Sequence, residues 1–110
     1  MNQALYDKLV EVAKAQKAIT YAEVAPLLGL DMSQVEDRTA MSLALREVSE
    51  HEFDNDRPLL SAVVVHTNNG MPGDGFFSMA SDFELFNRDL DDMDRFFVEE
   101  LTRVFEHHKA

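Results

Sequence analysis

The sequence predicts a mainly helical α+β domain in which one strand is followed by a glycine-rich turn. Apolar residues recur with helical spacing near both ends of the chain, over residues 2–17 and 90–108. Two Ser/Thr-x-x-Glu motifs are typical of helix starts. A continuous apolar run rich in β-branched residues, residues 59–67, is the only clear strand signal, and it ends in Asn-Asn-Gly.

Two helices are expected at the start of the chain. Residues 2–17 are amphipathic, with an apolar stripe made of Leu5, Leu9 and Val12. The motif Thr20-Tyr-Ala-Glu23 predicts a capping box that starts a short helix through Leu28, and Pro26 inside it restricts or kinks that helix. Gly29 is placed to end it, because glycine readily adopts the left-handed conformation of a C-terminal cap.

Three further helices follow in the pattern. The motif Ser33-Gln-Val-Glu36 predicts a second capping box and a longer helix to about Glu50. Its buried face is expected to consist of Met41, Leu45 and Val48. Residues 51–58 form a polar connector, and residues 76–86 and 90–108 are expected to be helical.

The apolar content of the strand at residues 59–67 is continuous rather than alternating, so both of its faces are expected to be covered. It needs a partner strand. The partner must come from the connector between Ile19 and Tyr21, from residues 71–77, or from another chain. Asn68-Asn69-Gly70 predicts a tight turn directly after the strand.

Helix, short helix, longer helix, strand and turn is the order of a winged-helix or helix-turn-helix module. We therefore expect residues 1–110 to form a single winged-helix-like domain, with one short β-hairpin and C-terminal helices. The length is sufficient for one modest hydrophobic core.

The formal charge of −11 is concentrated in two blocks. Residues 31–56 carry eight acids against two arginines, and residues 81–106 carry nine acids against three arginines, so each block has a net charge of −6. Such charge disfavours nucleic acid and favours a basic protein partner or plain solubility.

The sequence has no cysteine, which excludes disulfides and thiolate chemistry. No signal-peptide pattern or membrane-length apolar run is present, so a cytoplasmic protein is expected.

Parts of the chain resemble the DNA-binding domain of DNA alkyltransferases and alkyltransferase-like proteins. The segments are Thr20-Tyr-Ala-Glu-Val-Ala-Pro-Leu-Leu-Gly29, Ala40-Met-Ser-Leu-Ala-Leu45 and, more loosely, Leu60 to Gly73. The resemblance implies a winged-helix-like scaffold in which Tyr21 contacts the nucleotide backbone. The family's acceptor cysteine is absent, so alkyl transfer is excluded. Thr39 stands where the family inserts an arginine into the base stack, and Arg38 lies one residue earlier.

The whole chain also resembles a family of small uncharacterised bacterial proteins. The resemblance rests on residues 59–77, with their Met-Pro-Gly-Asp-Gly-Phe-Phe ending, and on a C-terminal helix that ends Glu-Leu-Thr-Arg-Val-Phe-Glu-His-His. It implies no activity.

The strand end and the turn after it supply most of the candidate binding residues. Glycine there lets backbone approach where side chains cannot fit. The candidates are Tyr21, Arg38, Thr39, His66, Asn68, Asn69, Gly73 and Asp74. Residues 70–75 form either an anion-binding nest or a structural turn, and Asp74 is also a candidate helix cap. His66 is either a ligand or base, or a half-exposed histidine without a role.

No cofactor or metal site is expected. The glycines form neither a dinucleotide fingerprint nor a P-loop. The carboxylates around His51 lack the order of a calcium-binding loop.

These observations favour a non-enzymatic binding or interaction module. Its expected partner is another protein, a basic one or a second copy of the chain, bound through the acidic surface. The alternative is DNA binding through the neutral face, using Tyr21, Arg38 and the turn at residues 68–73. A third possibility, a small enzyme or ligand-binding protein built on His66 and the glycine loop, requires a pocket beside His66.

Overall fold

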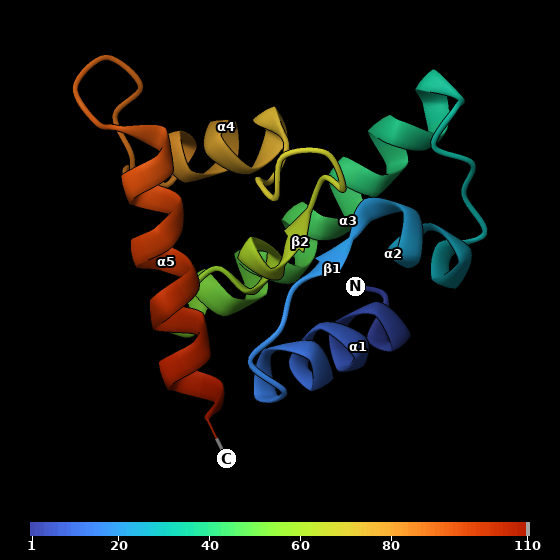
Figure 1. The fold of residues 1–110 in the computed structure, drawn as a ribbon, viewed down its shortest axis with the longest axis horizontal. Coiled ribbons are helices and arrows are strands. Elements are labelled where there is room, and N and C mark those ends of the chain that lie inside the picture. The colour runs from blue at the N-terminus through green and yellow to red at the C-terminus, as the bar shows by residue number, and fades with distance from the viewer. Residues whose placement is uncertain (110) are drawn as a thin grey trace.

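A short buried segment lies at the centre of the fold, with helices packed around it (Figure 1). The computed structural model describes residues 1–109. The elements in chain order are α1 (Gln3–Lys14), β1 (Ile19–Thr20), α2 (Tyr21–Leu28), α3 (Val35–Asp54), the 3-10 helix η1 (Leu60–Val63), β2 (Val64–Val65), α4 (Asp74–Asp82) and α5 (Met93–His108). The prediction of a mainly helical protein with a small sheet is confirmed.

The central segment consists of η1 and β2. Helices α1, α3 and α5 pack around η1, and β2 lies against β1 and α2. Every residue from Leu59 to Val65 is buried. Its backbone therefore needs partners inside the protein. The backbone N–H of Leu59 donates to the Glu100 carboxylate at 2.7 Å, and that of Ser61 donates to the Ser49 hydroxyl at 3.0 Å. Side chains of α3 and α5 thus hold the segment in place.

The predicted strand over residues 59–67 is wrong for most of its length, since only Val64–Val65 is a strand and Leu60–Val63 is a 3-10 helix. The reason lies in the partner strand. In the parallel register, residues 60–63 would need partners at residues 15–18. Those residues form the irregular turn after α1, where Gln16 has a φ of 59°, so residues 60–63 form a 3-10 helix instead.

The predicted β-hairpin is also wrong. β1 and β2 are parallel, with Ile19 paired to Val64 and Thr20 to Val65. Parallel neighbours need a long connection, which α2 and α3 supply here. Of the three partner strands considered, the connector at Ile19 is the correct one. The winged-helix assignment, whose wing is a hairpin, stays a prediction.

The turn predicted at residues 68–70 is confirmed, although it leads into α4 and not into a second strand. The N–H of Gly70 donates to the carbonyl oxygen of His66 at 2.9 Å, and Gly70 has a φ of 66°. The N–H of His66 donates to the carbonyl oxygen of Met71 at 2.8 Å, which closes the loop. Glycine suits this position because other residues rarely adopt a left-handed backbone.

The first predicted capping box is confirmed. The Glu23 N–H donates to the Thr20 hydroxyl at 3.2 Å, and the Thr20 N–H donates to the Glu23 carboxylate at 3.1 Å. Gly29, with a φ of 66°, ends α2 as expected, and Pro26 is accommodated within that helix.

The second predicted capping box is wrong. The cap of α3 is Gln34, and its side chain makes no capping bond within the described chain. Ser33 donates to the Asp31 carboxylate at 2.7 Å instead, because Asp31 lies in the turn that precedes the helix.

Helix α3 is longer than predicted. It continues past Glu50 to Asp54, and its buried residues include Met41, Leu45 and Val48 as expected. The polar connector predicted at residues 51–58 is therefore shorter, because its first four residues belong to α3. One of them, Glu52, is buried and ion-paired with Arg57. No helix in residues 1–109 combines the length and apolar character needed to cross a lipid bilayer.

Leu60→Ala should lower the free energy of unfolding by about 2–5 kcal/mol, because Leu60 is fully buried where three helices meet. The control, Leu43→Ala, removes the same atoms from a side chain that is 59% exposed and should change it by less than about 0.5 kcal/mol. Urea denaturation of both variants measures the difference. Equal effects would contradict the central position of this segment.

Candidate ligand-binding pocket

The parallel register brings Tyr21 and His66 together. Thr20 pairs with Val65, and Tyr21 and His66 are the next residue along each strand. Because parallel strands run in the same direction, the residues that follow them meet at the same edge of the sheet. The two rings lie 4.6 Å apart between centroids, at an interplanar angle of 37°. The pair closes one end of the sheet, where α2 begins and the glycine turn leaves.

Gly73 brings the turn back against this ring pair. Its N–H donates to the hydroxyl oxygen of Tyr21 at 2.7 Å. A Cβ atom at position 73 would lie 3.2 Å from both the Tyr21 hydroxyl oxygen and His66 Nε2, which is a tight contact. Glycine therefore allows the backbone to approach the two rings closely enough for the hydrogen bond.

Beside this ring pair lies a pocket of about 330 Å³, between α2, α3 and α4. Its apolar wall consists of Met32, Met41, Leu45, Phe76 and Met79. Its polar lining consists of Tyr21, Arg38, Ser42, Arg46, Ser61 and His66, and backbone at Gly73 and Gly75 completes it. The volume is at the small end of the range for sites that bind small molecules.

Half of the predicted candidates lie together in this pocket, namely Tyr21, Arg38, His66 and Gly73. The other four do not line the pocket. The Thr39 hydroxyl donates to the Val35 carbonyl oxygen at 3.2 Å, and Asn69 accepts the Met71 N–H at 2.9 Å within the turn. Asn68 is exposed.

Asp74 lies outside the pocket lining and forms an ion pair. It is the first residue of α4, whereas the cap itself is Gly73, so the expectation that Asp74 caps this helix is wrong. Its carboxylate is ion-paired with Arg88 at 2.9 Å, and Arg88 also donates to the Ser78 hydroxyl. Asp74 therefore ties the loop after α4 back to the first turn of the helix.

Sequence reasoning missed the apolar wall as part of a site. Met41 and Leu45 were expected only as core residues of α3, and both are buried. Gly75 shows how closely α4 approaches α3, because a Cβ atom there would lie 2.6 Å from the Ser42 hydroxyl oxygen. No local pattern indicates that these residues meet, since they come from separate helices.

The charges that line the pocket are unlike those of the chain as a whole. The net charge is −11, yet the lining includes two arginines and no aspartate or glutamate of residues 1–109. Arg46 is ion-paired with Asp82 at 3.0 Å, and its guanidinium lies 5.5 Å from the centre of the Phe83 ring. Arg38 is exposed, and within the described part of the chain its side chain has no ion pair or hydrogen bond.

Tyr21 contributes a neutral hydroxyl to the pocket. Burial raises the pKa of this phenol above its usual range, and the hydrogen bond from the Gly73 N–H offsets only part of the effect. The hydroxyl therefore keeps its proton at neutral pH. Because its oxygen already accepts from Gly73, that proton remains available to donate to a ligand.

No group of three or more His, Asp or Glu side chains in residues 1–109 is arranged to hold a metal ion. No protein-family model matches the chain, and comparisons with curated proteins and with solved structures give no match. The resemblances to alkyltransferase-like proteins and to small bacterial proteins therefore stay predictions.

The pKa of Tyr21 should be measurable directly. The chain has two tyrosines and no tryptophan, so the ultraviolet absorbance of a Tyr6→Phe variant reports tyrosinate formation at Tyr21 alone. We expect its midpoint above the ordinary value of about 10 in the folded protein and at that value in urea. Between these two pKa values only the unfolded state has lost the proton, so stability should fall as the pH rises above about 10. An unshifted midpoint in the folded variant would show that Tyr21 is not in a buried environment.

Proposed function

We propose that this protein is a non-enzymatic binding module whose binding site is the pocket beside Tyr21 and His66. The observation that carries the proposal is the arrangement of the pocket lining. Methionine, leucine and phenylalanine side chains form one wall, and a few polar groups converge at the strand ends. Small-molecule sites commonly combine a mostly apolar cavity with a few such polar groups.

Three methionines in the wall support a binding role. Met32, Met41 and Met79 come from the segment before α3, from α3 itself and from α4. Methionine side chains are unbranched and flexible, so they adjust to the shape of an occupant. An apolar group that enters the pocket would gain contacts on several sides without requiring the helices to move.

The polar groups favour binding over catalysis. A histidine that acts as a general base is commonly oriented by a carboxylate, and no aspartate or glutamate of residues 1–109 lines this pocket. The Ser61 hydroxyl lies 2.6 Å from the Ser49 hydroxyl, so it is engaged in a buried pair. The His66 ring packs against the Tyr21 ring, as expected of a residue that forms part of the pocket wall.

The pocket also weighs against DNA binding through Tyr21 and Arg38. The Tyr21 hydroxyl accepts the Gly73 N–H, which fixes the phenol against the turn. Arg38 follows Glu36 and Asp37 in the first turn of α3, which is acidic. A helix that reads DNA usually presents a basic surface to the phosphates.

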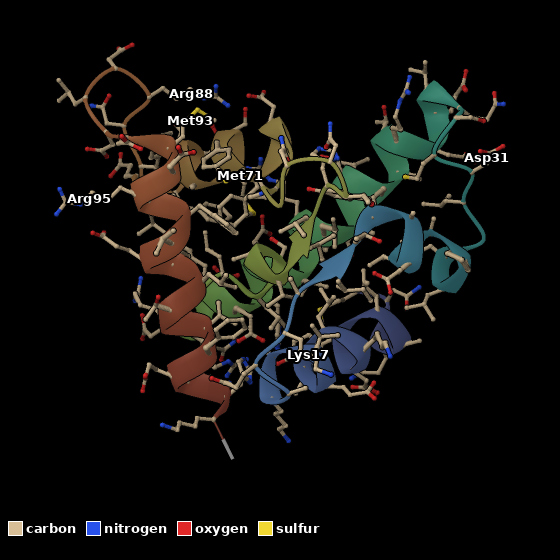
Figure 2. The ribbon with its side chains drawn as sticks, in the orientation of Figure 1. Lys17, Asp31, Met71, Arg88, Met93 and Arg95 are labelled. Carbon is tan, nitrogen blue, oxygen red and sulfur yellow. The ribbon has the colours of Figure 1, made fainter. Side chains whose placement is uncertain are left out.

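A protein partner bound through the acidic surface is the second candidate. The observation that favours it is the segment between α4 and α5, where apolar side chains stand among carboxylates. Leu90 is 82% exposed and Met93 is 41% exposed, and Asp89, Asp91, Asp92 and Asp94 surround them in the sequence. Figure 2 shows Met93 beside this loop, near Arg88. Exposed apolar groups ringed by acids suit a basic partner with an apolar anchor.

The pocket is tested by adding bulk to its lining. Ser42→Phe adds a ring at an exposed position in the pocket lining, and it should weaken binding of the fluorescent apolar probe N-phenylnaphthylamine by about tenfold or more. Leu43→Phe, the control, adds a ring at the next position of α3, outside the pocket lining. Fluorescence titration measures both affinities. Equal affinity in the two variants, or no binding to the unmodified protein, would exclude the pocket as the site.

The second candidate requires a different pair of variants. Leu90→Asp should abolish recovery of a stoichiometric basic partner in a pull-down, because it places a charge at the exposed apolar position. Val98→Asp makes the same change at a position of α5 that is 58% exposed, and it should leave recovery unchanged. Mass spectrometry identifies the partner. A strictly monomeric protein that recovers no partner would contradict this candidate.

A further inference from the structure

We infer that the occupant of the pocket is a small organic anion, an apolar body that carries a single acidic group such as a carboxylate. The inference rests on the proposed function, because it assumes that the pocket is the binding site, and it adds the chemical class of the ligand. The pocket volume of about 330 Å³ favours a small molecule over an extended polypeptide segment.

The first argument is the sign of the charge. The chain has 21 acidic residues among 110, and their field repels anions from most of its surface. The pocket lining departs from this pattern, because it includes Arg38 and Arg46 and no aspartate or glutamate of residues 1–109. An anion is therefore attracted to this site and repelled from the acidic surface around it. A cationic ligand would find no opposite charge in the pocket lining.

Arg38 is the group best placed to bind the anion. It lines the pocket, and within residues 1–109 it has no ion pair. A carboxylate can therefore bind its guanidinium without first displacing a protein carboxylate. Arg46 differs, since Asp82 lies 3.0 Å from its Nη1 and neutralises much of its charge. Arg38 is thus expected to contribute more to anion binding than Arg46.

Tyr21 supplies a second donor at the strand ends. Its hydroxyl oxygen accepts the Gly73 N–H at 2.7 Å, so its own proton is free to point toward a ligand oxygen. Hydrogen bonds to a charged acceptor are stronger than those between neutral groups. The apolar body would then lie against Met41, Leu45, Phe76 and Met79, which are all buried.

A matched pair of probes tests the charge directly. Anilinonaphthalene sulfonate and N-phenylnaphthylamine share the same ring system, and only the first carries an acidic group. For the folded full-length protein we expect the sulfonate to bind about tenfold more tightly, as for one charge-assisted contact. Equal affinities would overturn the inference and leave the pocket intact as a binding site. If neither probe binds, the proposed function fails together with the inference.

Two glutamine substitutions separate a local contact from the overall charge. Arg38→Gln should remove most of the tenfold preference for the sulfonate and leave binding of the neutral probe unchanged. Arg95→Gln changes the net charge by the same amount on the outer side of α5, where Figure 2 shows Arg95 directed away from the rest of the protein. It should preserve the preference. Equal losses in the two variants would mean that only net charge matters, which overturns the assignment of Arg38.

A third variant should act in the opposite direction. Asp82→Asn removes the carboxylate that pairs with Arg46, and it should strengthen binding of the sulfonate by a few-fold without affecting the neutral probe. Asp82 is exposed, so the change does not disturb the core. Unchanged sulfonate binding would remove Arg46 from the anion site.

Competition with unlabelled compounds tests the carboxylate itself. Decanoate should displace the bound sulfonate probe, and decanol should do so at least about tenfold less effectively. In Arg38→Gln the two competitors should become similar. Equal competition in the unmodified protein would show that the pocket recognises only the apolar body.

Discussion

The rest of the structure depends on one constraint, the burial of the segment from Leu59 to Val65 on all sides. A backbone that is removed from water must form its hydrogen bonds within the protein. Two of them go to side chains on different helices, Ser49 of α3 and Glu100 of α5. This is why Glu100, one of two buried glutamates, lies in the core of a strongly acidic chain. It also places α3 and α5 around a common centre (Figure 1).

The same constraint positions the pocket. The sheet that the segment forms with β1 ends after two pairs, because α2 begins at Tyr21, and Tyr21 and His66 follow at the same edge. After His66 the chain turns at Gly70 and comes back against the rings of Tyr21 and His66 at Gly73, where a side chain would crowd both rings. The polar end of the pocket is thus a direct consequence of parallel pairing. An antiparallel hairpin would have placed these two residues at opposite ends of the sheet.

The acidic charge has internal as well as external roles. Glu52 is buried and ion-paired with Arg57, and Glu100 binds the Leu59 N–H and Arg103. Burial alone would raise the pKa of Glu52, but the paired Arg57 guanidinium, together with the nearby Tyr6 hydroxyl, outweighs this effect and lowers it. Its contribution to stability is therefore present above the ordinary glutamate pKa and lost as the pH falls through the lowered one. Arg38 and Arg46 line the pocket, although the protein as a whole is strongly acidic.

The sequence by itself determined the helical class, the cap at Thr20, the end of α2 at Gly29 and the turn at Gly70, because short-range hydrogen bonds and backbone preferences set these features. It also indicated Tyr21, Arg38, His66 and Gly73 as candidates. Only the tertiary structure decided that these four share one pocket. Strand direction and the meeting of α3 with α4 depend on contacts between residues far apart in the chain, such as the 52 positions that separate Tyr21 from Gly73. Local patterns do not encode such contacts, so the apolar run at residues 59–67 indicated burial correctly for residues 59–65 only, and its conformation wrongly.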